Sequence, residues 1–563
     1  MPSFRRRSFS SCVLASLAFF VTAAPSLWAD ERIDLEAINR IRDEGLRRSQ
    51  IMETLRVFSD EIGPRLTASP QDEAARVWAT EKFRQWGLSN VALEPFSFGE
   101  GWSFTRSEVR IVAPFVTPVS ALPRAWTPST PGTVRGRAVQ VKLESDEDLE
   151  KQKGKLQGAI VFLDEARTKP AVDLAGKTEV QRHDEKTLAD LEPFEIPDEP
   201  DQGWRERSRK AWKFWPTLAK FLDEEGVVAL VELSSRDHGI IRLGSGGSRG
   251  AADRPRGVAS VTMAAEPYAR ILRLLDHDKE VELELTVETQ FHAGDGQARN
   301  VVAEIRGTDK AGGVVLAGAH LDSWHPGTGT NDNAAGSAVV MEAARILKAI
   351  GAKPKRTIRF LLWSGEEQGL LGSRAYVASH FATRPENTDP EEAVYPPALR
   401  KLTWPITPLP DHAKVSAYFN LDNGAGRIRG IYAQENVAVA PIFAAWLEPF
   451  RDLGATTVST NATGSTDHVP FDGVGIPGFQ FIQDPLDYST RTHHTELDTY
   501  DRAPREDMMA SATLFAAFLY QAAMRDEPLP RKPLPREPEK STSKRKEEPA
   551  RPAAPLVKGH DDH

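Results

Sequence analysis

Cysteine is nearly absent from this chain of 563 residues, and the single one, Cys12, lies in the N-terminal segment. That segment opens with a basic run, Arg5 to Arg7, and continues with an apolar run, Val13 to Ala24, that is too short to span a bilayer. We therefore expect residues 1–29 to be a signal peptide that is cleaved near Ala29. The mature chain would then have no cysteine, which excludes disulfides, thiolate metal ligands and a cysteine nucleophile.

Long apolar runs and an excess of positive charge are missing as well. No later stretch approaches the roughly 20 apolar residues of a membrane helix, so we expect no membrane anchor. The formal net charge is −9, and cleavage after Ala29 removes three arginines and takes it to −12. This sign argues against nucleic acid as a partner. We expect a secreted or periplasmic protein that is soluble once the signal peptide has been removed.

The most informative stretch runs from Gly318 to Ala343. A short apolar segment, Val314–Ala317, leads to His320 and Asp322, and a Gly/Thr-rich loop then brings Asn331-Asp332-Asn333 before an amphipathic helix. Open α/β sheets place their ligands at the carboxyl ends of strands. An imidazole suits zinc, and a carboxylate two residues on can hold the other ring nitrogen. Taken alone, a capped loop with a buried histidine remains an open alternative.

Further polar groups follow other apolar segments. Glu366 and Glu367 come after Thr357–Leu362, Asp422 comes after Val415–Leu421, and His493 and His494 come after Phe479–Ile482. Because parallel strands end at one edge of a sheet, we expect these groups to converge. Two histidines and three or four carboxylates are about what two zinc ions need, with positions left for water and substrate. The adjacent glutamates could divide metal binding and proton transfer, could both bind metal, or could be a solvated pair.

The order of the segments predicts an α/β fold. From about Arg299 the pattern is strand, loop, helix, repeated, which is typical of a mostly parallel sheet flanked by helices. We expect one catalytic domain over residues 30–115 and 294–525, interrupted by a β-rich insert over 116–293. The charged stretch Thr178–Arg209 predicts a surface loop. Residues 526–563, rich in Pro, Lys and Glu, predict a disordered tail.

The chain resembles the M28 family of co-catalytic zinc peptidases. The motifs that carry the resemblance occur in family order and are Gly318–Ser323, Asn331–Asn333, Gly365–Glu367, Asn420–Asp422 and His494–Thr499. Residues 116–293 resemble, on weaker signals, the protease-associated domain that many members contain. The resemblance implies the zinc exopeptidase fold (phosphorylase/hydrolase-like), two Zn²⁺ ions and a peptide or dipeptide substrate. His and carboxylate ligands also suit other divalent metals. A homodimer remains open.

The resemblance also implies a role for each site residue. The metal ligands would be His320, Asp332, Glu367, Asp422 and His494. Asp332 would bridge the two ions. His320 and Asp422 would complete one site, and Glu367 and His494 would complete the other. Glu366 would be the general base, and Asp322 would orient His320.

One position departs from the common family pattern. Many members carry tyrosine just before the last histidine, and its hydroxyl helps to hold the oxyanion. Here the residue is His493, as in the carboxypeptidase Q branch, and it would either donate a hydrogen bond or only pack, with Tyr488 and Arg491 as competing donors. We expect His325 to shape its loop, and Asp467-His468 to lie on a loop of the cleft. The long segment 381–414 could wall off part of that cleft.

We therefore expect a secreted di-zinc exopeptidase, with aminopeptidase ranked slightly above carboxypeptidase or dipeptidase. An inactive binding relative is disfavoured because every ligand position and Glu366 are filled. A cyclising transferase with one zinc is disfavoured by the insert. Serine catalysis has little support, since Gly244-Ser245-Gly246 lacks the G-x-S-x-G frame.

Overall fold

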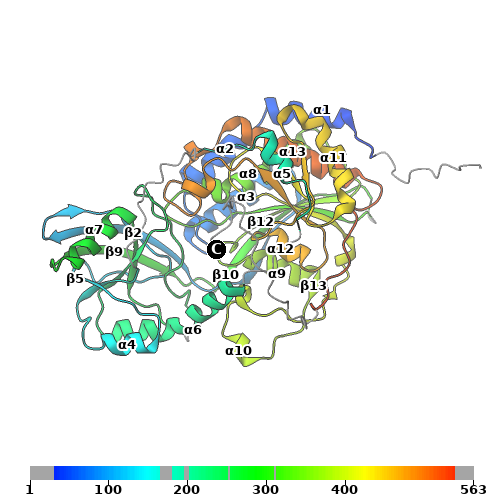
Figure 1. Cartoon of the computed structure of the whole chain (residues 1–563). Coiled ribbons are helices and arrows are strands. Elements are labelled where there is room, and N and C mark those ends of the chain that lie inside the picture. Colours follow the sequence, from blue (N-terminus) through cyan, green and yellow to red (C-terminus); the bar gives the residue numbers. More distant parts are fainter. Residues whose placement is uncertain (1–30, 165–179, 196–201, 251–253, 310–311, 539–563) are drawn as a thin grey trace, which may run out of the picture. The chain divides into compact units, whose positions relative to one another are not determined.

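The computed structural model describes residues 31–164, 180–195, 202–250, 254–309 and 312–538. The predicted signal peptide and residues 539–563 of the predicted tail lie outside the described residues. The described residues from Ile33 on form one compact unit that is built on two eight-stranded sheets (Figure 1). Within the described ranges, no helix has the length and apolar character that crossing a bilayer requires.

The first sheet carries the strand ends that the sequence singled out. Its strand order is β1-β10-β12-β11-β15-β18-β16-β17. The strands are β1 (Ser89–Ser97), β10 (Gln297–Ile305), β11 (Val314–His320), β12 (Thr357–Trp363), β15 (Val415–Asn420), β16 (Ile428–Tyr432), β17 (Thr457–Ser459) and β18 (Gly478–Gln483). Strands β12, β11, β15 and β18 are neighbours and run parallel. Strands β11, β15 and β18 are buried along their whole length, which explains their largely apolar sequences.

Helices cover both faces of this sheet, which confirms the predicted α/β class. One face packs into a large core with α1 (Leu35–Arg47), α2 (Ile51–Arg56), α3 (Pro70–Gln85), α8 (Ala335–Ala349), α11 (Ala440–Leu447) and α13 (Arg505–Met524). The other face packs against α9 (Leu371–His380) and α12 (His468–Asp472). Residues 381–414 hold only short elements, namely β13 (Ala382–Thr383), α10 (Pro390–Ala393), β14 (Thr407–Pro408) and the 3-10 turns η3 (Pro397–Leu399) and η4 (His412–Lys414).

The second sheet belongs to the insert and has the order β3-β2-β9-β5-β6-β7-β8-β4. Its strands are β2 (Gly101–Ala113), β3 (Thr117–Pro118), β4 (Ala121–Pro123), β5 (Val134–Gln140), β6 (Ala159–Phe162), β7 (Ala229–Leu233), β8 (Ala259–Met263) and β9 (Glu282–His292). Helix α7 (Ala265–Asp276) packs on one face, and α4 (Asp146–Gln152) and α6 (Gln202–Glu224) on the other. The sheet begins at Gly101 rather than at residue 116, because β2 pairs with β9 along nearly its whole length.

The stretch Thr178–Arg209, predicted as a surface loop, contains α5 (Glu185–Asp190) and the start of α6. Its charges suggested solvent exposure, yet several of them meet partners that are distant in the sequence. The Arg209 guanidinium pairs with the buried Glu392, and the Arg182 guanidinium pairs with the buried Asp484 at 2.9 Å. Such tertiary partners cannot be read from local composition.

The predicted tail also begins later than expected. Residues 527–532 dock on the domain that contains the first sheet, here called the sheet domain. Leu529 is only 2% exposed, and its N–H donates to the Ser416 hydroxyl at 3.1 Å. The Arg531 guanidinium donates to the carbonyls of His412 and Val415, and Lys532 pairs with Asp472. An extended proline-rich segment needs no core of its own when it can use one that is already formed.

Replacing Leu529 with alanine should lower the free energy of unfolding by about 2–3 kcal/mol, because a buried leucine side chain is lost and a cavity remains. The matched control is Leu534→Ala in the same segment, where the side chain is 38% exposed; we expect a change within about 0.5 kcal/mol. Chemical denaturation of both variants tests this. Equal stability losses in the two variants would mean that the segment is not docked as described.

Candidate active site

The ends of four parallel strands bring the predicted site residues together. His320 is the last residue of β11, and its Nε2 atom lies 3.3 Å from Oδ1 of Asp332 and 3.4 Å from Oδ1 of Asp422. Asp332 comes from the turn Thr330–Ala334 that precedes α8, and Asp422 follows β15. All three side chains are buried, so these groups form a first cluster of polar atoms that is shielded from solvent.

A second cluster shares Asp332 with the first. Nε2 of His494, in the loop after β18, lies 3.2 Å from Oδ2 of Asp332 and 3.0 Å from Oε2 of Glu367. One oxygen of Asp332 therefore faces each histidine. The side chains of Glu366 and Glu367 are only 10% and 3% exposed, which rules out the alternative of a solvated pair.

The nitrogen and oxygen atoms of these two clusters are suitably placed to bind metal ions. Ligands about 2.0–2.1 Å from a tetrahedral zinc lie about 3.3–3.4 Å from each other, close to the observed separations of 3.0–3.4 Å. His320 Nε2, Asp332 Oδ2 and Glu367 Oε1 are buried and make no hydrogen bond within the described part of the chain. Buried polar atoms are normally paired, so several unpaired ones in one place indicate a cation-binding site.

The electrostatics of the site lead to the same conclusion. Burial, with the nearby Asp422 and Asp467, raises the pKa of Glu366 well above its ordinary value. Burial and the charge of Asp332 raise the pKa of Glu367 to about 7. Burial acts the same way on Asp332, but the two facing histidines hold its pKa well below its ordinary value. Crowded carboxylates of this kind are stabilised by positive charge, which bound cations would supply.

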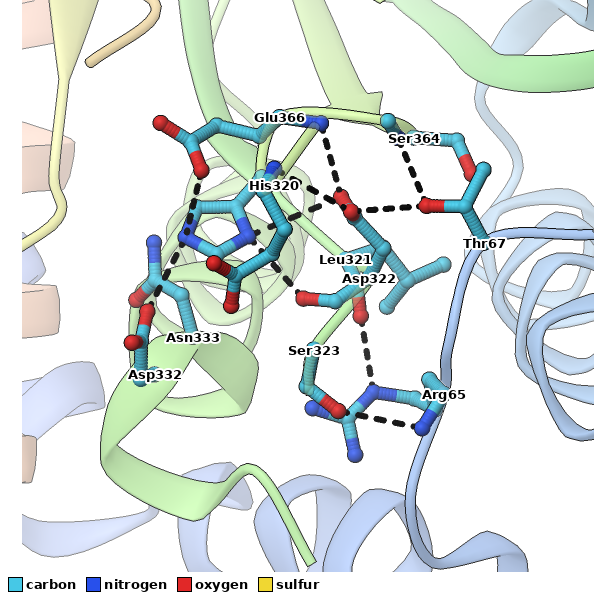
Figure 2. A network of polar contacts seen from close by, with 12 residues as sticks. Arg65, Thr67, His320, Leu321, Asp322, Ser323, Asp332, Asn333, Ser364 and Glu366 are labelled. Carbon is cyan, nitrogen blue, oxygen red and sulfur yellow. Dashed lines mark hydrogen bonds and ion pairs between the residues drawn. The ribbon is translucent and has the colours of Figure 1, made fainter. Parts of the chain in front are cut away.

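Asp322 organises the site through its main chain as well as its carboxylate (Figure 2). Nδ1 of His320 donates to the Asp322 carbonyl at 2.9 Å, while the nearest carboxylate oxygen lies 3.6 Å away. Because a carbonyl only accepts, Nδ1 carries a proton, so Nε2 is the ring nitrogen that could bind a metal. The Asp322 carboxylate instead accepts from the main-chain N–H groups of Glu366 and Glu367 and from the Thr67 hydroxyl.

Arg65 supports the same loops and was missed in the sequence. Its side chain is fully buried and donates to the carbonyls of Leu321 and Gly329, each at 2.7 Å. It also donates to the carbonyl of Thr328, next to Gly329. Burial lowers the pKa of Arg65 to about 10. No sequence signal identifies such a residue, because its partners are main-chain atoms of distant segments.

Asp498 holds the turn that carries Asp332. Its carboxylate accepts from the N–H of Asn331 at 2.6 Å, from the Asn331 side-chain amide at 2.9 Å and from the N–H of Asp332 at 3.0 Å. The aspartate belongs to the last motif of the sequence, but that motif alone does not reveal this role. The Asp498 carboxylate thus fixes the main chain at Asp332, the residue that the two clusters share.

His493 lies beside the clusters rather than within the closest contacts. Its ring packs against that of Tyr488 in a tilted arrangement with centroids 4.9 Å apart, and Nε2 is 3.8 Å from Oδ2 of Asp332. With a quarter of its side chain exposed, His493 can reach a bound molecule. Asp467 is buried, accepts from the Ser373 hydroxyl, and has its pKa raised to about 7 by burial. His325 bonds to the Pro123 carbonyl at 2.8 Å, which agrees with a loop-shaping role.

Comparison with known proteins shows which family the region of the site matches. Residues 300–519 match peptidase family M28. The part of the chain that carries the site therefore matches this family. Carboxypeptidase Q of Mus musculus is 24% identical over 88% of this chain and 90% of its own length. The crystal structure of a peptidase M28 precursor from Shewanella amazonensis matches with a TM-score of 0.60 and 25% identity, over 89% of this chain and 99% of that one. A zinc aminopeptidase from Bacillus subtilis shares the fold, with a TM-score of 0.52 and 17% identity over 85% and 95% of the two chains.

The M28 match makes the chain a metallopeptidase, a hydrolase that acts on peptides. The matched region begins in β10 and ends within α13, so it contains all four parallel strands whose ends meet at the clusters. The insert and the first three helices lie outside it, although Arg65 and Thr67, which precede the matched region, also support the site.

Replacing Asp498 with asparagine should weaken metal binding about 10- to 100-fold, because loss of support for metal-binding residues typically has that effect. The new amide group would face N–H donors that the carboxylate now satisfies. The control is Asp501→Asn, an exposed aspartate three residues on. Competition with a chelating dye measures zinc affinity in both variants. An unchanged affinity in the Asp498 variant would remove the supporting role assigned to it.

Proposed function

We propose that this chain is an exopeptidase with two zinc ions. The observation that carries the proposal is the position of Asp332, which turns one oxygen to His320 and the other to His494. His320 and Asp422 would hold one ion, Glu367 and His494 the other, and Asp332 both. When bound, two zinc ions polarise the scissile carbonyl and lower the pKa of an attacking water.

Glu366 is proposed as the general base. Its main-chain N–H is held by Asp322, and its side chain, with Oε2 3.9 Å from Nε2 of His320, borders the first cluster. There it would take a proton from the attacking water and pass it to the departing amine. Glu367 is the better metal ligand of the pair because it lies 3.0 Å from His494.

His493 is proposed to contact the substrate. It could also be a third nitrogen ligand beside Asp332 and His494. Glu367 is the closer ligand, because its Oε2 lies 3.0 Å from Nε2 of His494. Nε2 of His493, in contrast, lies 3.8 Å from Oδ2 of Asp332. A partly exposed ring that packs against Tyr488 is better placed to donate a hydrogen bond to the oxygen that becomes negative in the transition state.

We further propose that the enzyme reads the C-terminal carboxylate of its substrate, as a carboxypeptidase or dipeptidase. The sequence alone ranked aminopeptidase first. The similarity to carboxypeptidase Q over nearly the whole of both chains supports ranking carboxypeptidase or dipeptidase above aminopeptidase. The His493-His494 pair supports the same ranking. Aminopeptidase remains the second candidate because a zinc aminopeptidase has the same fold. Export is proposed only from the basic and apolar runs of residues 1–29.

Glu366→Gln should lower kcat about 10²- to 10⁴-fold, the usual contribution of general acid–base catalysis, while the protein keeps its zinc. The matched control is the neighbouring Glu367→Gln, which should lose zinc as well as activity. Turnover and zinc content are measured on the same preparations. Loss of zinc from the Glu366 variant would make Glu366 a ligand and leave the base unassigned.

The substrate end can be tested with one dipeptide in free, N-blocked and C-amidated forms. We expect cleavage of the free form and none of the amidated form, because the amide removes the carboxylate. Cleavage of the N-blocked form separates a carboxypeptidase from a dipeptidase. Cleavage of the amidated form but not the N-blocked form would establish an aminopeptidase instead.

A further inference from the structure

A loop of the insert runs alongside the last histidine of the site. Residues 234–243, here called the insert arm, follow β7. The N–H of Leu243 donates to the His494 carbonyl at 2.9 Å, and the N–H of Ile241 donates to the carboxylate of Glu496 at 2.9 Å. Arg242, between them, pairs with Thr495 as an antiparallel bridge. The insert arm is therefore bonded directly to the main chain that carries His494.

The insert arm is internally braced, so it presents Arg242 in a fixed position. The hydroxyl of the buried Ser234 donates to the Ile240 carbonyl at 2.7 Å and accepts from the N–H of Arg242 at 3.1 Å. The side chains on either side of Arg242, those of Ile241 and Leu243, are buried in a small core of the insert. The Arg242 side chain is half-buried, and its Nη2 atom lies 3.4 Å from Nδ1 of His494.

This contact is chemically unusual for a metal-binding histidine. When Nε2 binds a metal, the neutral ring carries its proton on Nδ1, which normally donates to a carboxylate or a carbonyl. His320 has such an acceptor in the Asp322 carbonyl. His494 instead faces a guanidinium, which has only donors. With the metal bound, the Nδ1–H of His494 would therefore need an acceptor beside the guanidinium of Arg242.

We propose that this acceptor is the C-terminal carboxylate of the substrate, held by Arg242 of the insert. The inference rests on the proposed function, since only an enzyme that reads the C-terminus needs such a group. A carboxylate has two oxygens that can accept from the fork of an arginine and from a neighbouring N–H together. Arg236, on the same insert arm, adds a second positive charge that acts on His493. These charges offset the repulsion that the carboxylates of the site exert on an anionic substrate.

The test compares Arg242→Gln and Arg242→Lys with the unchanged enzyme, using the same dipeptide in free and C-amidated forms. We expect Arg242→Gln to raise KM for the free form about 30- to 100-fold, as loss of a charge-assisted pair does, with little change in kcat. Arg242→Lys should recover part of this, because lysine keeps the charge but not the planar fork. Selectivity for free over amidated dipeptide should fall towards unity in Arg242→Gln.

Two further measurements separate binding from structure. Calorimetry with Glu366→Gln protein, which should bind without turnover, should show tighter binding of free than of amidated dipeptide, and the added Arg242→Gln change should abolish this difference. Zinc content and melting temperature should not change. The matched control is Arg110→Gln, which removes an equal charge from the insert at an exposed pair with Glu284 on β9 and should leave KM unchanged.

The outcomes distinguish this inference from the proposed function. If the enzyme needs a free C-terminus and both Arg242 variants keep that preference, the inference is wrong and the proposed function stands. If the unchanged enzyme cleaves amidated dipeptides and requires a free amine, the proposed substrate end fails and this inference fails with it. If Arg242→Gln loses zinc or melts early, and Arg242→Lys does too, Arg242 has a structural role only.

Discussion

The carboxylate of Asp332, held between two imidazoles, is the constraint on which the rest of the structure depends. Three more carboxylates, those of Glu366, Glu367 and Asp422, are buried around it, and such a group of negative charges is costly without compensating cations. The surrounding fold keeps this arrangement in place largely through main-chain atoms. Asp322 and Asp498 accept from the N–H groups of the site residues, while Arg65 donates to the carbonyls of their loops.

Much of the fold and the site could be predicted because both follow from the same pattern. An unbroken apolar strand in a parallel sheet is buried on both faces, and its first polar residues mark its carboxyl end. Residues such as His320 and Asp422 can therefore be identified from the sequence alone. The roles of Arg65, Asp498 and Arg242 could not be, since each depends on contacts with segments that are far away in the chain.

The wrong predictions have the same physical origin. The charged start of α6 looked like a loop, and the proline-rich start of the tail looked disordered, because composition reports only on a segment in isolation. Arg209 and Leu529 find their partners on the sheet domain, and those partners determine the structure that each segment adopts. The early start of the second sheet likewise depends on pairing between β2 and β9, which are distant in the chain.

The loop after β18, which carries His493 and His494, is held by the insert at its two ends. Leu243 bonds to His494 at one end, and Gln181 pairs with Leu486 at the other. The two sheets are consequently not independent modules, even though each has its own core. A graft that transferred the catalytic sheet without its insert would leave the histidine loop without these anchors. Recombination between relatives should therefore be tolerated only where both parts of this enzyme are inherited together.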